Sequence, residues 1–122
     1  MKIAVTAVGE GMDAQVDPRF GRAACFAMVD TETMACESIE NGNVAAAGGA
    51  GINSAKVVID AGAEAVLTGN CGPNAERTLR AAKVKLYTGV SGTVGEAVAQ
   101  FKAGSLTEAT GPSVDSHAGM GG

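Results

Sequence analysis

Short apolar runs alternate with helical patterns through the second half of the chain, and this alternation constrains the fold more than any other feature. The runs at 65–68 and 84–87 are short and bounded by Gly or polar residues, which is typical of buried strands. Helical patterns precede, separate and follow them, at 54–61, 73–82 and 94–102. Strands joined through helices pair in parallel, with the helices packed against the sheet.

Residues with strong terminal preferences mark the ends of these helices. Gly62 and Gly104 follow the first and third patterns, where glycine commonly ends a helix. Pro73 occupies the first position of the second predicted helix. A backbone N–H at that position would have no acceptor within the helix, so proline is well tolerated there. Thr93 can cap the third helix, and Glu96, three residues later, completes a capping box. These signals predict three separate helices.

The first forty residues contain no helical pattern and predict three strands. Apolar stretches cover 2–8, 25–30 and 34–40, and the polar segment 30–33 indicates a hairpin between the last two. Three strands are therefore followed by three helices that alternate with two further strands. This order predicts an α/β fold with a mixed five-stranded sheet, in which the first strand lies parallel to both strands of the second half.

Length and composition limit the chain to one small domain. Its 122 residues suit a single core, and because 46% are hydrophobic but only 3% aromatic, that core must consist of small aliphatic side chains. Residues 107–122 are mostly Gly, Ser, Thr and Ala without periodicity. We expect a domain over residues 1–106 and a flexible tail over 107–122.

Charge and cysteine content exclude several classes of protein. Nine Lys and Arg against 13 Asp and Glu give a net charge of −4, a poor basis for contacts with nucleic-acid phosphates. No apolar run approaches the ~18 residues that span a membrane. Three irregularly spaced cysteines, and a chain that leads directly into a strand, favour the reducing cytoplasm. We expect Cys25 and Cys36 to be core residues without a disulfide between them.

Three glycine-rich segments fall where open α/β sheets bind ligands, beyond the carboxyl ends of the parallel strands. They are residues 9–22, Gly48-Gly49-Ala50-Gly51 and Gly69-Asn70-Cys71-Gly72-Pro73. Glycines let backbone N–H groups approach a ligand closely, and N–H groups at helix starts attract anions. Arg19 and Arg22 add two positive charges to the first segment. The sequence predicts a site for a sizeable anion. The simpler alternative is that the glycines only form turns and that both arginines are solvated or paired with nearby aspartates.

Other reactive side chains give weaker signals. Cys71 lies between a strand and a helix start, which predicts either an exposed thiol with a lowered pKa or a small buried residue. His117 and Met120 are soft-metal ligand types, but in a flexible tail we expect them to bind nothing. P-loop, dinucleotide-binding, C-x-x-C and H-E-x-x-H motifs are absent, and the only histidine lies in the tail. These absences disfavour His-based acid–base or triad catalysis.

The glycine-rich segments also resemble a known family in both composition and order. The motifs that carry the resemblance are Asp17-Pro18-Arg19-Phe20-Gly21-Arg22-Ala23, Gly48-Gly49-Ala50-Gly51 and Leu67-Thr68-Gly69-Asn70-Cys71-Gly72-Pro73-Asn74-Ala75. Over about residues 1–106 the chain is similar to the dinitrogenase iron–molybdenum cofactor biosynthesis family. The resemblance implies a ribonuclease-H-like fold with sheet order 3-2-1-4-5, the second strand antiparallel, and helices on both faces. Family members bind, carry or insert preformed metal–sulfur clusters and are not generally enzymes.

The resemblance also implies a particular cargo. Short, single-domain relatives with Asp-Pro-Arg-Phe-Gly are associated with a molybdenum–copper sulfide cluster held without covalent attachment. The nitrogenase branch often has a His where this chain has Arg19, which favours an ion-paired molybdenum–copper cluster over an iron–molybdenum-type cluster. We expect Cys71 as a candidate sulfur ligand. The expected cluster-binding residues are Arg19, Phe20, Gly21, Arg22, Gly48, Gly49, Ala50, Gly51, Asn70, Cys71 and Gly72.

Two further expectations concern activity and partners. Ribonuclease H chemistry needs several carboxylates around two metal ions, and the strands offer only Asp30, Glu37 and Glu40, so we expect no hydrolysis. The alternative to a cluster carrier is a regulatory protein that docks on a partner, such as a nucleotide-dependent ATPase, without an obligatory cluster. We expect a monomer or weak homo-oligomer.

Overall fold

A mixed sheet between two layers of helices forms the domain. The computed structural model describes residues 1–41 and 50–109. The sheet has the order β3-β2-β1-β4-β5, as expected. The elements are β1 (Lys2–Ala7), β2 (Cys25–Asp30), β3 (Cys36–Glu40), α1 (Ala50–Asp60), β4 (Ala65–Leu67), α2 (Pro73–Ala81), β5 (Lys85–Tyr87) and α3 (Val94–Lys102).

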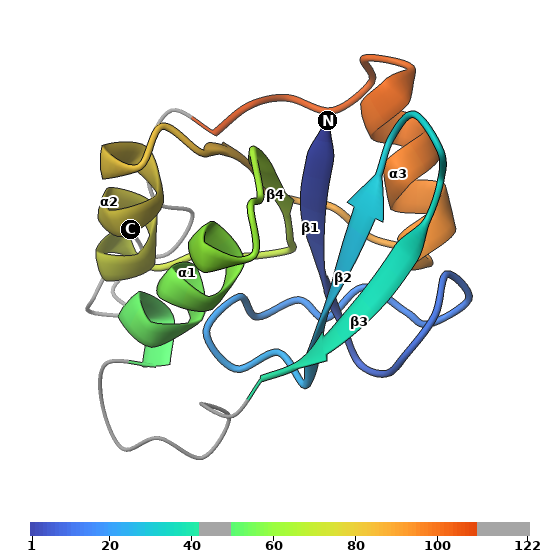
Figure 1. The fold of residues 1–122 in the computed structure, drawn as a ribbon. Helices are drawn as coiled ribbons and strands as arrows, with labels where there is room; N and C mark the ends of the chain where they lie inside the picture. Colours follow the sequence, from blue (N-terminus) through green and yellow to red (C-terminus); the bar gives the residue numbers. More distant parts are fainter. Residues whose placement is uncertain (42–49, 110–122) are drawn as a thin grey trace.

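Strand directions follow the predicted topology. β2 is antiparallel to both β1 and β3, whereas β1, β4 and β5 are mutually parallel. Figure 1 shows α1 and α2 on one face of the sheet and α3 on the other. This arrangement confirms the predicted α/β class, the antiparallel second strand and helices on both faces.

The central strands are buried on both faces, so successive side chains enter different cores. On β1, Ile3 and Val5 pack towards α3 with Val98, whereas Ala4 packs towards α1 and α2 with Leu79. Apolar side chains fill these positions because both faces of the sheet are covered. Two cores therefore hold the strands whose carboxyl ends carry the candidate loops.

The predicted helix-end signals are confirmed. The Thr93 hydroxyl accepts from the Glu96 N–H, and the Glu96 carboxylate accepts from the Thr93 N–H, which completes the capping box. Gly62 and Gly104 adopt positive φ values of 92° and 74° after their helices. No helix in the described part of the chain is long and apolar enough to cross a membrane.

Two element boundaries differ from the prediction by more than one residue. β3 begins at Cys36 rather than at residue 34, because Met34 adopts a φ of 62° and its N–H donates to the Asp30 carbonyl within the hairpin turn. α1 begins at Ala50, although Ala50 and Gly51 were expected in a loop and the helix was expected from residue 54. Packing against α2 outweighs the poor helix propensity of Gly51.

The chain after α3 stays attached to the sheet beyond the predicted domain boundary. Glu108 pairs antiparallel with Tyr87, and the Ala109 N–H donates to the Leu86 carbonyl at 2.7 Å. The first residues of the predicted tail therefore lie along the edge of β5. The rest of that tail, with His117 and Met120, lies outside the described residues.

Candidate functional site

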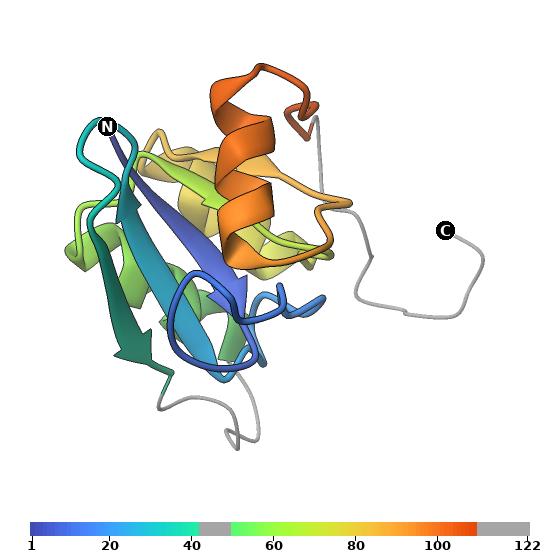
Figure 2. The ribbon, with the colours of Figure 1, turned by 90° about the vertical axis from the view of Figure 1, so that its right-hand side faces the viewer.

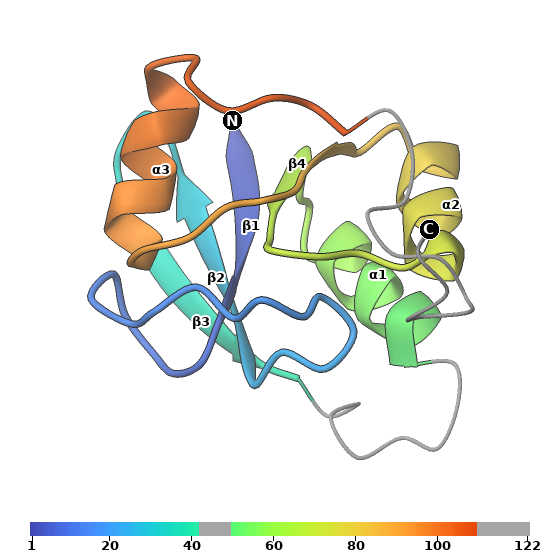
Figure 3. The same ribbon diagram turned by 180° about the vertical axis from the view of Figure 1, so that it is seen from behind.

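The candidate loops meet at one edge of the sheet. β1, β3, β4 and β5 run in the same direction, so their carboxyl ends share this edge, and all three helices begin there (Figures 1 and 3). We call residues 17–22 and 68–73, with Ala50 and Gly51, the loop edge. The structure thus brings together all the predicted cluster-binding residues that it describes. Gly48 and Gly49 lie outside the described residues.

A strap of residues 17–20 lies directly on the segment that follows β4. The Asn70 N–H donates to the Pro18 carbonyl at 2.7 Å, and the Phe20 N–H donates to the Asn70 carbonyl at 3.1 Å. Arg19 and Asn70 pair in parallel, as in a short extra ladder. An ideal Cβ on Gly69 would lie only 2.7 Å from the Pro18 Cα. Gly69 is therefore required because two backbones touch there.

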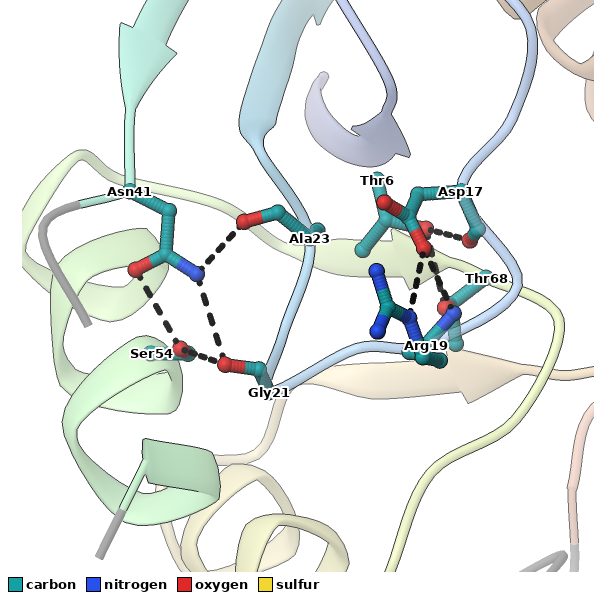
Figure 4. Close-up of polar contacts among 8 residues, drawn as sticks. All are labelled: Thr6, Asp17, Arg19, Gly21, Ala23, Asn41, Ser54 and Thr68. Carbon is teal, nitrogen blue, oxygen red and sulfur yellow. Dashed lines mark hydrogen bonds and ion pairs between the residues drawn. The ribbon is translucent and has the colours of Figure 1, made fainter. Parts of the chain in front are cut away.

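A buried polar network anchors the start of the strap (Figure 4). The Thr6 hydroxyl donates to the Asp17 carbonyl at 2.7 Å and hydrogen-bonds with the Thr68 hydroxyl at 2.9 Å. The Asp17 carboxylate accepts from the Arg19 N–H at 3.0 Å and lies 3.5 Å from the Arg19 Nε. The Asp17 side chain is only 4% exposed, whereas that of Arg19 is 64% exposed. The strap therefore fixes the base of Arg19 and leaves most of its side chain open to solvent.

A second polar network anchors the other end of the first loop, also shown in Figure 4. The Asn41 side-chain amide donates to the carbonyls of Ala23 (2.8 Å) and Gly21 (3.4 Å). The Ser54 hydroxyl donates to the same Gly21 carbonyl at 3.2 Å. The loop is therefore fastened to the end of β3 and to α1. Sequence reasoning missed Asn41 and Ser54, as it missed Thr6 and Thr68, because their partners are distant in sequence.

Phe20 has a different role from the one expected. Its side chain is 1% exposed and packs against Phe26 with ring centroids 5.7 Å apart. Only its backbone can face a ligand, because the ring is an apolar anchor. Arg19 and Arg22 on either side are exposed at the surface. The anchor therefore holds two cationic side chains at the loop edge.

The first turns of α1 and α2 touch each other at this edge. An ideal Cβ on Gly51 would lie 3.2 Å from the Ala75 Cβ. The N–H groups of a first helical turn have no intrahelical acceptors and carry a partial positive charge. Gly72 caps α2 without a side-chain hydrogen bond, and no atom of the described residues lies within 4 Å of its ideal Cβ. Two helix starts therefore converge beside an open backbone surface.

Cys71 faces the core, so the prediction of an exposed thiol with a lowered pKa is wrong and its buried alternative is confirmed. The residue is 1% exposed, and its thiol lies 3.7 Å from the Gly72 carbonyl oxygen. Burial raises the pKa of Cys71 to about 12, and the nearby Glu76 carboxylate adds to the increase. A helix start lowers the pKa of a thiol only if the thiol faces the N–H groups of the first turn. Here the side chain points away from them into apolar surroundings.

The remaining cysteines match most of their prediction. Cys25 is buried, but Cys36 is only half-buried on the outer strand. In the β2–β3 register Cys25 lies opposite Glu40 and Cys36 opposite Val29, so no disulfide joins them. Within residues 1–41 and 50–109, no three His, Cys, Asp or Glu side chains are placed to hold a metal ion.

Fold and site together define a three-layer α/β domain whose candidate binding surface consists of backbone N–H groups and arginines. The chain belongs to the dinitrogenase iron–molybdenum cofactor family, whose model matches residues 1–104. The predicted family is therefore confirmed. A search of curated proteins finds no match.

Solved structures show the same fold. The apo form of the orange protein from Desulfovibrio gigas is 48% identical, with a TM-score of 0.89, over 91% of this chain and 94% of that one. A putative NifB protein from Thermotoga is 38% identical, with a TM-score of 0.77, over 88% and 91%. A putative dinitrogenase from Methanocaldococcus jannaschii shares the fold at 16% identity, with a TM-score of 0.62, over 92% and 97%.

Proposed function

We propose that this protein carries or scaffolds an anionic metal–sulfide cluster, held without covalent attachment at the loop edge. Membership of the iron–molybdenum cofactor family and the likeness to the orange protein support a cluster as cargo. We further propose that the cargo is a molybdenum–copper sulfide, because Arg19 supplies a cation where an imidazole ligand would suit an iron–molybdenum cluster. The proposed role is binding rather than catalysis.

The observation that carries the proposal is the convergence of the first turns of α1 and α2 beside two exposed arginines. An anion that leaves water must exchange its hydration for hydrogen-bond donors and positive charge. The first turns offer N–H groups, and Arg19 offers a guanidinium whose base is fixed by Asp17. Gly72 leaves the surface of the α2 start open. These groups suit the sulfide face of an anionic cluster.

The state of Cys71 supports non-covalent binding. A thiol must lose its proton to ligate a metal, and a pKa of about 12 leaves this one protonated near neutral pH. Because the side chain is buried, ligation by Cys71 also requires the loop at 68–73 to open. Charge and hydrogen bonds are therefore available at the surface without rearrangement, whereas a thiolate is not.

The test is a titration of the apoprotein with tetrathiomolybdate and copper, followed by visible absorbance. Replacing Arg19 and Arg22 together by Ala should weaken binding by about tenfold or more, because each charged hydrogen bond contributes a factor of this order. Raising the salt concentration should weaken wild-type binding, since exposed charges are screened.

The matched control removes the same charge at the opposite edge of the sheet. Lys83 and Lys85 precede and begin β5, and both side chains are exposed. Their double Ala variant should bind as the wild type does. Equal affinity in the two double variants would refute the loop-edge site, and a wild type that binds no cluster would refute the function itself. Elemental analysis of protein from its natural source would identify the metals.

A further inference from the structure

The two outer edges of the sheet differ in whether another segment of the chain pairs with them. At the β5 edge, Glu108 and Ala109 cover Tyr87 and Leu86 with backbone pairing. At the other edge, β3 pairs with β2 and with no other strand of the described ranges. Figure 2 shows β3 at the outside of the sheet. An uncovered edge strand presents backbone donors and acceptors that can pair with another chain.

Hydrogen bonds at both ends of the β2–β3 ladder reveal which groups point outwards. The Asp30 N–H donates to the Ala35 carbonyl, and the Asn41 N–H donates to the Ala24 carbonyl. Hydrogen-bonded pairs alternate along an antiparallel ladder, so the odd-numbered residues of β3 face β2. The N–H and C=O groups of Cys36, Ser38 and Glu40 therefore point to the open edge.

An acidic hollow flanks this edge on each face of the sheet. The first hollow has a volume of about 400 Å³ and is lined by Ser38 and Glu40 together with Glu10 and Cys25. Glu37 and its cross-strand neighbour Met28 belong to the opposite face and line a second hollow of about 240 Å³ together with Asp30 and Lys2. A strand added to β3 would send alternate side chains to the two faces, one set towards each hollow.

The carboxylates around β3 are largely uncompensated. Glu10, Glu37 and Glu40 form no ion pair within the parts of the chain that the structure describes; the pairs found there are Arg19–Asp17 and Arg80–Glu76. Among the residues that the structure describes, Lys2 is the single cation that lines either hollow. The open edge therefore presents unpaired backbone groups, and the hollow on each face of the sheet beside it carries net negative charge.

We propose that β3 is a docking edge for an extended, lysine- or arginine-bearing segment of a partner protein. Backbone pairing to Cys36, Ser38 and Glu40 provides the attachment, and the two acidic hollows select basic side chains. A second copy of the chain is a poor occupant, because pairing β3 with β3 brings two acidic edges together. The proposal does not depend on the nature of the cargo.

The test uses the isotope-labelled full chain and a blocked peptide, Thr-Lys-Lys-Thr-Lys-Lys-Thr, whose lysines lie on both faces of an extended strand. Binding is studied by NMR and amide hydrogen exchange. The peptide should slow exchange at the outward amides of Cys36, Ser38 and Glu40. The amides of Glu37 and Ile39 should change little, because they already pair with β2. The same peptide methylated at every backbone nitrogen should bind much less well, because neither of its edges keeps N–H donors.

A matched pair of variants separates this edge from general attraction to an acidic protein. Glu37→Gln with Glu40→Gln should weaken peptide binding about fivefold. Asp60→Asn with Glu108→Gln removes the same charge from the end of α1 and from the β5 edge, and should leave binding nearly unchanged.

Several results would overturn the proposal. Absence of peptide binding, equal weakening in both double variants, or protection outside β3 would each do so. Protection of the same three amides at raised protein concentration without peptide would show that the occupant is a second copy.

Discussion

Replacing Gly69 by Ala tests the contact on which the loop edge depends. The new Cβ would lie 2.7 Å from the Pro18 Cα and 2.9 Å from the Pro18 carbonyl oxygen. Both are backbone atoms, so no side-chain rotation can relieve the clash. The strap at 17–20 must move away from the segment after β4, and this movement disturbs the 2.7 Å hydrogen bond between Asn70 and Pro18.

The size of the effect follows from that geometry. Ordinary contact begins near 3.4 Å, so the strap must retreat by about 0.7 Å, the difference between 3.4 and 2.7 Å. Forcing extra atoms into a packed site typically costs about 1–3 kcal/mol. For a domain of this size, such a loss lowers the melting temperature by roughly 4–15 °C. Cluster binding should weaken as well, because the strap carries Arg19.

Urea and thermal unfolding followed by far-ultraviolet circular dichroism would measure the change. The control is Gly72→Ala in the same loop, where nothing lies within 4 Å of the added Cβ and the φ of −77° suits alanine. We expect that variant to unfold within about 0.5 kcal/mol of the wild type. Equal stability of the two variants would refute the close packing of the strap on Gly69.

Two further predictions concern the buried thiol and the C-terminal segment. Burial raises the pKa of Cys71 from 9.0 to about 12, so its contribution to stability is complete below pH 9.0 and is lost as the pH rises towards 12. Unfolding measured across this range should show a decline of at most about 1.4 kcal/mol per pH unit, which Cys71→Ala should remove. Truncation after Leu106 should cost about 1 kcal/mol more in urea unfolding than truncation after Ala109, because only the former removes the pairing to β5. Equal midpoints for the two truncated chains would show that this pairing contributes nothing.

Helix ends could be predicted from the sequence because their signals are local, whereas the sheet order 3-2-1-4-5 was implied by the resemblance to the family. Pro73, Thr93 and Gly104 act through their own backbone, and the alternation of elements leaves few topologies. The start of α1 could not be predicted, because Gly51 favours a loop locally. Its helical state depends on contact with Ala75, which lies in another helix. At Gly51, packing between α1 and α2 therefore outweighs the low helix propensity of glycine.

The candidate site was predictable in location but not in orientation. Glycine-rich segments after parallel strands indicated the edge at which these loops meet, and both arginines are exposed there. The side chains of Phe20 and Cys71 turn inwards, because the strap and the segment after β4 cover each other. The side chains that such a contact buries depend on pairing between segments about fifty residues apart. That pairing cannot be inferred from the composition of either segment.

Local rather than overall charge decides what each surface of this chain can hold. A net charge of −4 would oppose the binding of an anion at the loop edge only if distant carboxylates acted on that edge. At physiological salt the interaction between exposed charges is screened within about 8 Å. Arg19 and Arg22 lie at the loop edge, whereas Glu37 and Glu40 lie on β3. The two proposed surfaces therefore attract opposite charges. They adjoin at Asn41, which follows β3 directly and donates to the loop of Arg19 and Arg22. A basic segment paired with β3 would end beside the loop edge, so its cations could add to the two arginines there.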